Sequence, residues 1–116
     1  MTEPTFDREG YPTEETLQAL REWPMETAAA GLDFLSACWK DGYMAESGLA
    51  KDVLPPAEIE TICADDDERV LRLPTGGWSG NEDAVNAFME SLAATMTWCL
   101  HARGGLWIFK YPEVKA

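Results

Sequence analysis

Thr75-Gly76-Gly77-Trp78-Ser79-Gly80-Asn81-Glu82 is the stretch around which this chain is organised. It places three glycines and a tryptophan between a predicted strand, residues 69–73, and a predicted helix that begins at Asn81. Glycine adopts positive φ angles without steric cost, but fixing its backbone loses more entropy than fixing that of any other residue. Three glycines within five positions therefore predict a turn that side chains would block, with at least one of Gly76, Gly77 and Gly80 at positive φ.

The serine of this motif is predicted to cap the helix rather than to react. Ser79 and Glu82 have the three-residue spacing of a capping box, with Ser79 as the N-cap. The segment lacks the closing glycine of the hydrolase pattern G-x-S-x-G. The single histidine, His101, lies at the far end of the predicted helix, and a helix of about 20 residues is about 30 Å long. We therefore assign no catalytic residue.

No cofactor or metal site is predicted either. A glycine-rich turn before a helix can bind phosphate, but Glu82 and Asp83 would repel an anion from the first turn. The acidic run at residues 65–68 lacks the alternation and the glycine of a calcium-binding loop. The cysteines show no zinc spacing, and we expect reduced, mostly buried thiols at Cys38, Cys63 and Cys99.

Two helices are predicted near the N-terminus. Thr13 is a good N-cap for a helix over residues 13–23, which Pro24 ends because proline disfavours helical geometry in the residue before it. Apolar residues at helical spacing then predict a second helix over residues 25–39. Lys40-Asp41-Gly42 is its predicted stop, with a lysine in the last turn and a glycine after it.

The middle of the chain is predicted to contain a loop and a β-hairpin. Residues 41–57 show little periodicity, and Tyr43 and Met44 could anchor them to the core. Residues 58–63 and 69–73 then read as two strands. The hairpin tip between them holds the acidic cluster Asp65, Asp66, Asp67 and Glu68.

The C-terminal part is predicted as one long helix followed by a strand. The helix spans residues 81–101, and its apolar stripe consists of Val85, Phe88, Leu92, Met96 and Cys99. Gly104 or Gly105 can end it in the left-handed conformation. Residues 106–111 form a strand of high β-propensity.

These elements follow the order α-α-β-β-α-β and predict a small α+β domain spanning residues 1–116, with helices packed on a three-stranded sheet. Residues 1–10 are expected to form a flexible or loosely packed arm. The last β-α-β unit predicts a right-handed crossover, which would place the final strand parallel to the strand before the glycine motif.

The chain of 116 residues has a net charge of −12, and that charge is unevenly distributed. Residues 1–68 carry 17 acidic and four basic residues, a net charge of −13, whereas residues 69–116 have a net charge of +1. Such acidity disfavours direct binding to nucleic acid, because phosphate must be neutralised by basic side chains. It would attract a protein partner with a basic surface, or it could serve solubility alone.

The interaction residues follow from this charge pattern. The acids expected to contact a partner are Glu14, Glu15, Asp65, Asp66, Asp67 and Glu68. Trp78 is either an exposed anchor at an interface or a plug beneath the glycine turn. No apolar run approaches the roughly 20 residues that span a bilayer, and the N-terminus lacks the apolar region of a signal peptide. We expect a cytoplasmic protein that does not bind membranes, of undetermined oligomeric state.

The glycine motif also carries a resemblance. Together with Trp98, the run Arg103-Gly104-Gly105 and the aromatic strand around Phe109, it resembles a family of small uncharacterised proteins from bacteriophage, prophage and bacterial genomes. Tyr11-Pro12 and Trp23-Pro24 are similar as well, so the matching region covers about two-thirds of the chain. Residues 41–60 depart from the family pattern. The resemblance implies a mobile-element context and no activity.

Two classes of function remain open. One is a non-enzymatic protein-interaction module, such as a phage-type inhibitor of a host nucleic-acid-binding or defence complex, of which an anti-CRISPR protein would be one instance. The other is a small-ligand-binding protein or small enzyme that uses the glycine-rich turn at residues 75–82. It would need a concave pocket lined by Trp78, Ser79, Asn81 and Arg103.

Overall fold

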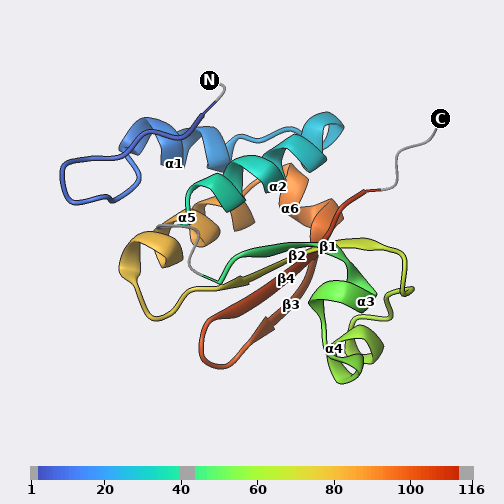
Figure 1. The fold of residues 1–116 in the computed structure, drawn as a ribbon. Coiled ribbons are helices and arrows are strands. Elements are labelled where there is room, and N and C mark those ends of the chain that lie inside the picture. Colours follow the sequence, from blue (N-terminus) through green and yellow to red (C-terminus); the bar gives the residue numbers. More distant parts are fainter. Residues whose placement is uncertain (1–2, 40–43, 113–116) are drawn as a thin grey trace.

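A four-stranded antiparallel sheet lies at the centre of the α+β domain, in the order β1-β2-β4-β3 (Figure 1). The computed structural model describes residues 3–39 and 44–112. The strands are β1 (Glu46–Leu49), β2 (Arg69–Pro74), β3 (Trp98–Ala102) and β4 (Leu106–Lys110). The predicted class is therefore confirmed, but the sheet has four strands and not three.

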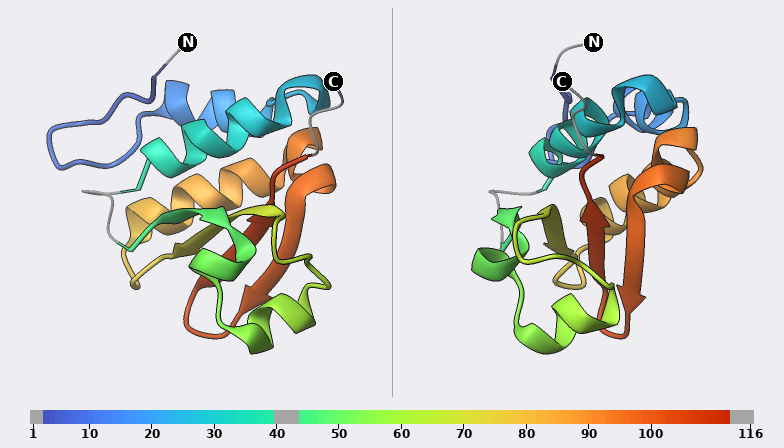
Figure 2. Two further views of the ribbon diagram at one scale, coloured as in Figure 1. Left: turned by 45° about the vertical axis from the view of Figure 1, so that its right-hand side comes forward. Right: turned by 90° about the vertical axis from the view of Figure 1, so that its right-hand side faces the viewer.

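Two groups of helices pack against this sheet, as Figure 2 shows. The first group consists of α1 (Glu14–Arg21), the 3-10 helix η1 (Met25–Thr27), α2 (Ala28–Ala37), α5 (Ser79–Met89) and α6 (Leu92–Thr97). The second consists of α3 (Ala50–Val53) and α4 (Pro56–Thr61).

The main core lies between the first helix group and one face of the sheet. Because side chains alternate across a strand, Leu71 and Leu73 of β2 face this core together with Phe109 of β4. Val70 and Ile108 point to the opposite face, where they pack against the region of α3 and α4. Period-2 alternation therefore assigns each half of the two central strands to its own cluster.

The first predicted helix is confirmed. Thr13 is the N-cap of α1, and its hydroxyl oxygen accepts a hydrogen bond from the Thr16 N–H at 3.3 Å. The second helix is present as η1 and α2. Its predicted stop at residues 40–42, like the anchor Tyr43, lies outside the described residues, whereas Met44 is exposed and not an anchor.

The N-terminal segment leads into α1 through a short turn. The Thr5 N–H donates to the Thr16 hydroxyl at 2.8 Å, and the Thr13 N–H donates to the Thr5 carbonyl at 3.0 Å. An isolated bridge joins Phe6 to Pro12. These contacts hold residues 5–13 against the start of α1, so that Tyr11 lies next to the glycine motif.

The predicted hairpin of residues 58–63 and 69–73 is wrong in its first half. Residues 56–61 form helix α4, with Pro56 at its first position, where proline is favourable because its φ is already helical. The strand that pairs with β2 on this side is β1, within the segment predicted to be a loop. Residues 65–68 are therefore a turn between a helix and a strand and not the tip of a hairpin.

The predicted helix over residues 81–101 is also wrong in its second half. Helix α5 ends at Met89, and Ser91 caps α6 by accepting from the Ala94 N–H at 3.1 Å. From Trp98 the chain is extended, as β3. The chain then reverses between Ala102 and Leu106, so β4 runs antiparallel to β2 and the predicted parallel crossover does not form.

The cysteines only partly follow the prediction. All three are free: Cys38 is buried, Cys99 is half-buried and Cys63 is exposed. Burial raises the pKa of the Cys38 thiol to about 12. This thiol is therefore protonated and unreactive at neutral pH.

Candidate functional site

The glycine motif forms a tight turn between β2 and α5. Gly76 and Gly77 have φ angles of 65° and 77°, which confirms the prediction of positive φ in this motif. The Trp78 N–H donates to the Thr75 carbonyl at 3.2 Å, and the Asn81 side chain donates to the same carbonyl at 3.1 Å. The buried Asn81 thereby fixes the turn to the first turn of α5.

Trp78 fills the space that a ligand at this turn would need. Its ring lies against Gly80, where an added Cβ would overlap the indole. On its other side it contacts the Tyr11 ring, with 5.0 Å between the ring centroids. Trp78 therefore packs the turn against the N-terminal segment.

Ser79 is not a helix cap, contrary to the prediction. The N-cap of α5 is Trp78, and no side chain caps this helix end. The Glu82 N–H donates to the Trp78 carbonyl at 3.2 Å, so the capping box does not form. The Ser79 hydroxyl instead donates to the Tyr11 hydroxyl oxygen at 3.0 Å. The sequence could not reveal this contact, because its partner lies 68 residues away.

This difference has a measurable consequence. We expect Ser79→Ala to lower the free energy of unfolding by about 0.5 kcal/mol or less, because it removes an exposed hydrogen bond. Ser91→Ala is the matched control and should cost about 1 kcal/mol or more, since Ser91 is a buried helix cap. Chemical denaturation of both variants measures the two values. A larger loss at Ser79 than at Ser91 would contradict the assignment.

The run Arg103-Gly104-Gly105 meets the glycine motif in space. The Thr75 N–H donates to the Gly105 carbonyl at 2.9 Å, which links the end of β2 to the turn between β3 and β4. Gly104 and Gly105 have φ angles of 86° and 84°. The predicted left-handed glycines are thus present, but they form a hairpin turn rather than a helix end. Arg103 is exposed beside them.

The acidic cluster at residues 65–68 lines a groove of about 510 Å³. Its walls are formed by Ala29, Asp65, Asp67, Glu68, Arg69, Tyr111 and Pro112. Asp65, Asp66 and Asp67 are exposed and form no ion pair within residues 3–39 and 44–112. Glu68 accepts from the Asp65 N–H at 2.9 Å and pairs with Lys110 at 3.6 Å. Glu68 therefore holds the turn, while the aspartates face solvent.

One side of the groove combines an aromatic ring with a further carboxylate. The Tyr111 hydroxyl donates to Asp33 of α2 at 2.8 Å. The Arg69 guanidinium lies over the Tyr111 ring, 4.1 Å from its centroid, and is 3.9 Å from the Asp33 carboxylate. This part of the groove already holds one cation against an aromatic face and a carboxylate, which is the arrangement that binds lysine and arginine side chains.

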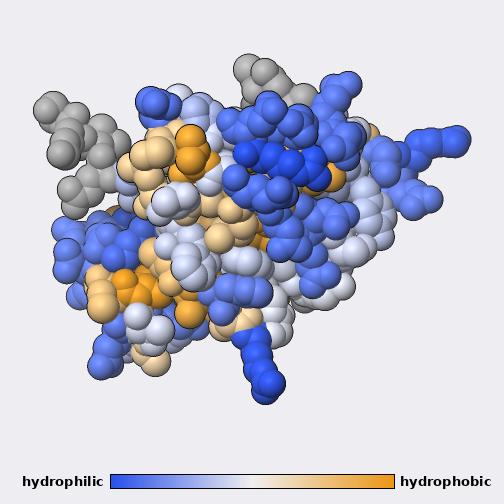
Figure 3. Space-filling view, turned by 180° about the vertical axis from the view of Figure 1, so that it is seen from behind, coloured by the Kyte–Doolittle hydropathy of each residue, from blue (hydrophilic) through white to orange (hydrophobic). Residues whose placement is uncertain are grey.

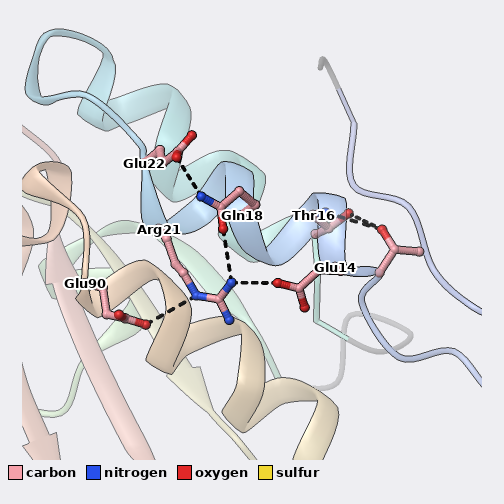
Figure 4. A network of polar contacts seen from close by, with 7 residues as sticks. Glu14, Thr16, Gln18, Arg21, Glu22 and Glu90 are labelled. Atoms are coloured by element: carbon pink, nitrogen blue, oxygen red, sulfur yellow. Dashed lines mark hydrogen bonds and ion pairs between the residues drawn. The ribbon is translucent and has the colours of Figure 1, made fainter.

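The second predicted acidic site lies elsewhere. Glu14 and Glu15 are in the first turn of α1, at the opposite end of the molecule from residues 65–68 (Figure 1). Figure 4 shows Arg21 between Glu14, at 2.9 Å, and Glu90 of α5, at 3.4 Å. Glu14 is therefore partly neutralised, and the structure does not bring the two predicted acidic sites together.

The groove is suited to binding rather than to covalent chemistry. Burial raises the pKa of the Tyr111 phenol above its ordinary value, and the hydrogen bond to Asp33 raises it further. Tyr111 is therefore a neutral hydrogen-bond donor at physiological pH, not a nucleophile. Among the described residues, no group of three or more histidine, cysteine or acidic side chains is arranged to hold a metal ion.

Several surface residues were not identified as exposed from the sequence. Leu92 and Met96 were assigned to a buried helical stripe, but both are exposed on α6, and Trp98 is exposed at the start of β3. His101, expected at a helix end, lies on β3 and stacks on Trp107 with 3.7 Å between ring centroids. The β-branched and aromatic residues at 95–98 were the available signal for a strand near this point.

No helix within residues 3–39 and 44–112 has the length and apolar character needed to cross a bilayer. Comparisons with protein-family models, with curated proteins and with solved structures found no match.

Proposed function

We propose that the protein is a non-enzymatic interaction module whose acidic groove binds a basic segment of a partner protein. The observation that carries this proposal is the groove wall formed by Asp65 and Asp67. Both carboxylates are exposed, and neither is paired with a cation in the part of the chain that the structure describes. They can therefore accept hydrogen bonds from an incoming lysine or arginine.

The overall charge supports the same partner chemistry. A net charge of −12 attracts a basic surface over distances longer than a contact, which raises the rate of encounter. The groove then supplies local geometry, because Arg69 on Tyr111 already shows how a guanidinium fits there. Long-range attraction and local fit thus favour one class of partner.

A complex that handles nucleic acid is the natural source of such a basic surface, since phosphate binding requires clustered lysine and arginine. The more specific proposal is therefore a cytoplasmic, phage-type inhibitor, similar in action to an anti-CRISPR protein, that covers the basic surface of a host complex. The resemblance of the motif at residues 75–82 to phage and prophage proteins supports this context. A small-ligand site at that motif is not proposed, because Trp78 packs against Gly80 there.

The proposal can be tested with an oligo-arginine peptide of defined length as the probe. We expect the double variant Asp65→Asn, Asp67→Asn to bind it about tenfold more weakly than the unaltered protein at low salt. The matched control is Glu14→Gln, Glu15→Gln, which removes the same number of charges at the other end of the molecule. We expect this control to weaken binding by less than about threefold, because exposed charges at a distance are screened. Fluorescence anisotropy measures all three affinities.

The pair of variants separates the groove from bulk charge. Equal weakening in both would mean that net charge alone attracts the peptide and that the groove is not the site. Unchanged binding in both would reject the acidic module altogether. Capture of partners from a host lysate by the unaltered protein, but not by the groove variant, would then identify the complex.

A further inference from the structure

The back of the molecule carries an apolar surface that the proposed function does not use. Leu92, Met96 and Trp98 are 64%, 50% and 47% exposed. Leu92 and Met96 are four residues apart on α6 and therefore share one side of the helix, and Trp98 follows at the start of β3. We name these three side chains the α6–β3 surface. Figure 3 shows hydrophobic groups gathered on this half of the back and hydrophilic groups on the half formed by α1.

The charge pattern around this surface is unlike that of the rest of the chain. From Ser91 to Pro112 the sequence contains no aspartate or glutamate, although the whole chain has 21. The charged residues in this segment are Arg103 and Lys110. A basic partner, which the acidic groove would attract, gains nothing electrostatic here. The α6–β3 surface therefore needs a different partner.

Strand β3 also forms one edge of the sheet, but its geometry argues against simple strand addition. Its pairing with β4 shifts register between Trp98 and Leu100. Such bulges at an edge interrupt the row of backbone groups that another strand would pair with. A partner on this side must therefore contact the side chains of the α6–β3 surface rather than extend the sheet.

We infer that the partner on the α6–β3 surface is a second copy of this chain, in a two-fold symmetric dimer. Two copies that each carry a charge of −12 repel each other wherever acids meet acids. The acid-free segment from Ser91 to Pro112 is where they can approach without that cost. A two-fold axis places the same surface on both sides, so that the rigid Trp98 ring of one copy packs on the flexible Leu92 and Met96 of the other.

This dimer is a weak one, because three exposed apolar side chains make a small contact area, and small interfaces are characteristic of transient complexes. It leaves the groove of residues 65–69 accessible, since that groove lies outside the α6–β3 surface. The dimer would present two grooves to a partner and raise the effective affinity by bivalent binding.

The inference is tested by sedimentation of the full chain over a range of concentrations. We expect the unaltered protein to show a reversible monomer–dimer equilibrium, and Met96→Glu to raise its dissociation constant by at least about tenfold, because a charge would be buried in the contact. Met44→Glu is the matched control. Met44 is 55% exposed and precedes β1, at the other edge of the sheet, so this variant should associate like the unaltered protein.

Three results would overturn the inference: a protein that stays monomeric up to about 1 mM, association that Met96→Glu leaves unchanged, or equal effects of the two substitutions. Equal melting temperatures of the two variants show that the comparison is between folded proteins. Amide hydrogen exchange gives a second readout, since the amides of α6 and β3 should become more protected as the concentration rises. Protection confined to other elements would place the contact elsewhere.

Discussion

Replacing Gly105 with alanine is expected to lower the free energy of unfolding by about 3 kcal/mol or more, from two separate causes. Gly105 has a φ of 84°, a conformation that costs an alanine about 1–2 kcal/mol. In addition, the new Cβ would overlap the hydroxyl oxygen of Thr75. Thr75 is buried and accepts a hydrogen bond from the Gly77 N–H, so it cannot move without disturbing the glycine turn.

Gly104 provides the control for this prediction, because it separates backbone strain from packing. Its φ of 86° is nearly the same, but a Cβ there would meet no atom within 4 Å. Gly104→Ala should therefore cost only the strain, about 1–2 kcal/mol. Urea denaturation of the two variants gives the difference directly. Equal losses would show that Thr75 does not constrain the turn between β3 and β4.

The elements that the sequence predicted well are those with local signals. Thr13 and Pro24 bound the first helix, and the alternation around Leu71 marks β2. Positive φ in the glycine motif follows from the residue type alone. In each case the cause and the structure lie within a few residues of each other.

The elements that were missed depend on pairing with distant residues. β1 has no sequence pattern of its own and is a strand because it pairs with β2. Leu92 and Met96 continue the helical spacing of α5, but Ser91 starts a new helix, and pairing with β4 then makes Trp98 extended. A pattern that fits a long helix was thus overruled by contacts that a local reading cannot include.

The same distinction applies to the candidate site. The acids at 65–68 were recognisable from composition. Their neighbours in the groove, however, come from the other ends of the chain: Tyr111 and Asp33, which bond each other, are 78 residues apart. The sequence could therefore propose the charge but not the aromatic wall. Ser79 illustrates the converse, since a correct local spacing suggested a cap whose hydroxyl is in fact bonded to Tyr11.

The second large effect is expected at Gly80, where the sign of a common substitution is reversed. A glycine inside a helix usually becomes about 1 kcal/mol more stable when replaced by alanine. At Gly80 the Cβ would overlap the Trp78 ring, which is itself held against Tyr11. We expect Gly80→Ala to lose about 2 kcal/mol instead, because the indole must leave its position.

A double-mutant cycle with Trp78→Ala shows whether that clash is the cause. If the indole is the obstacle, Gly80→Ala should become neutral or stabilising once residue 78 is alanine, with a coupling energy of about 2 kcal/mol or more. Gly77→Ala tests the alternative of a strained turn. Its φ is 77° and a Cβ there meets nothing within 4 Å, so its cost should be the same with or without the indole. Chemical denaturation of the six proteins measures every term. A loss at Gly80 that persists without Trp78 would mean that the motif is held by its backbone alone, and the packing of Trp78 on Gly80 would no longer argue against a ligand site at this turn.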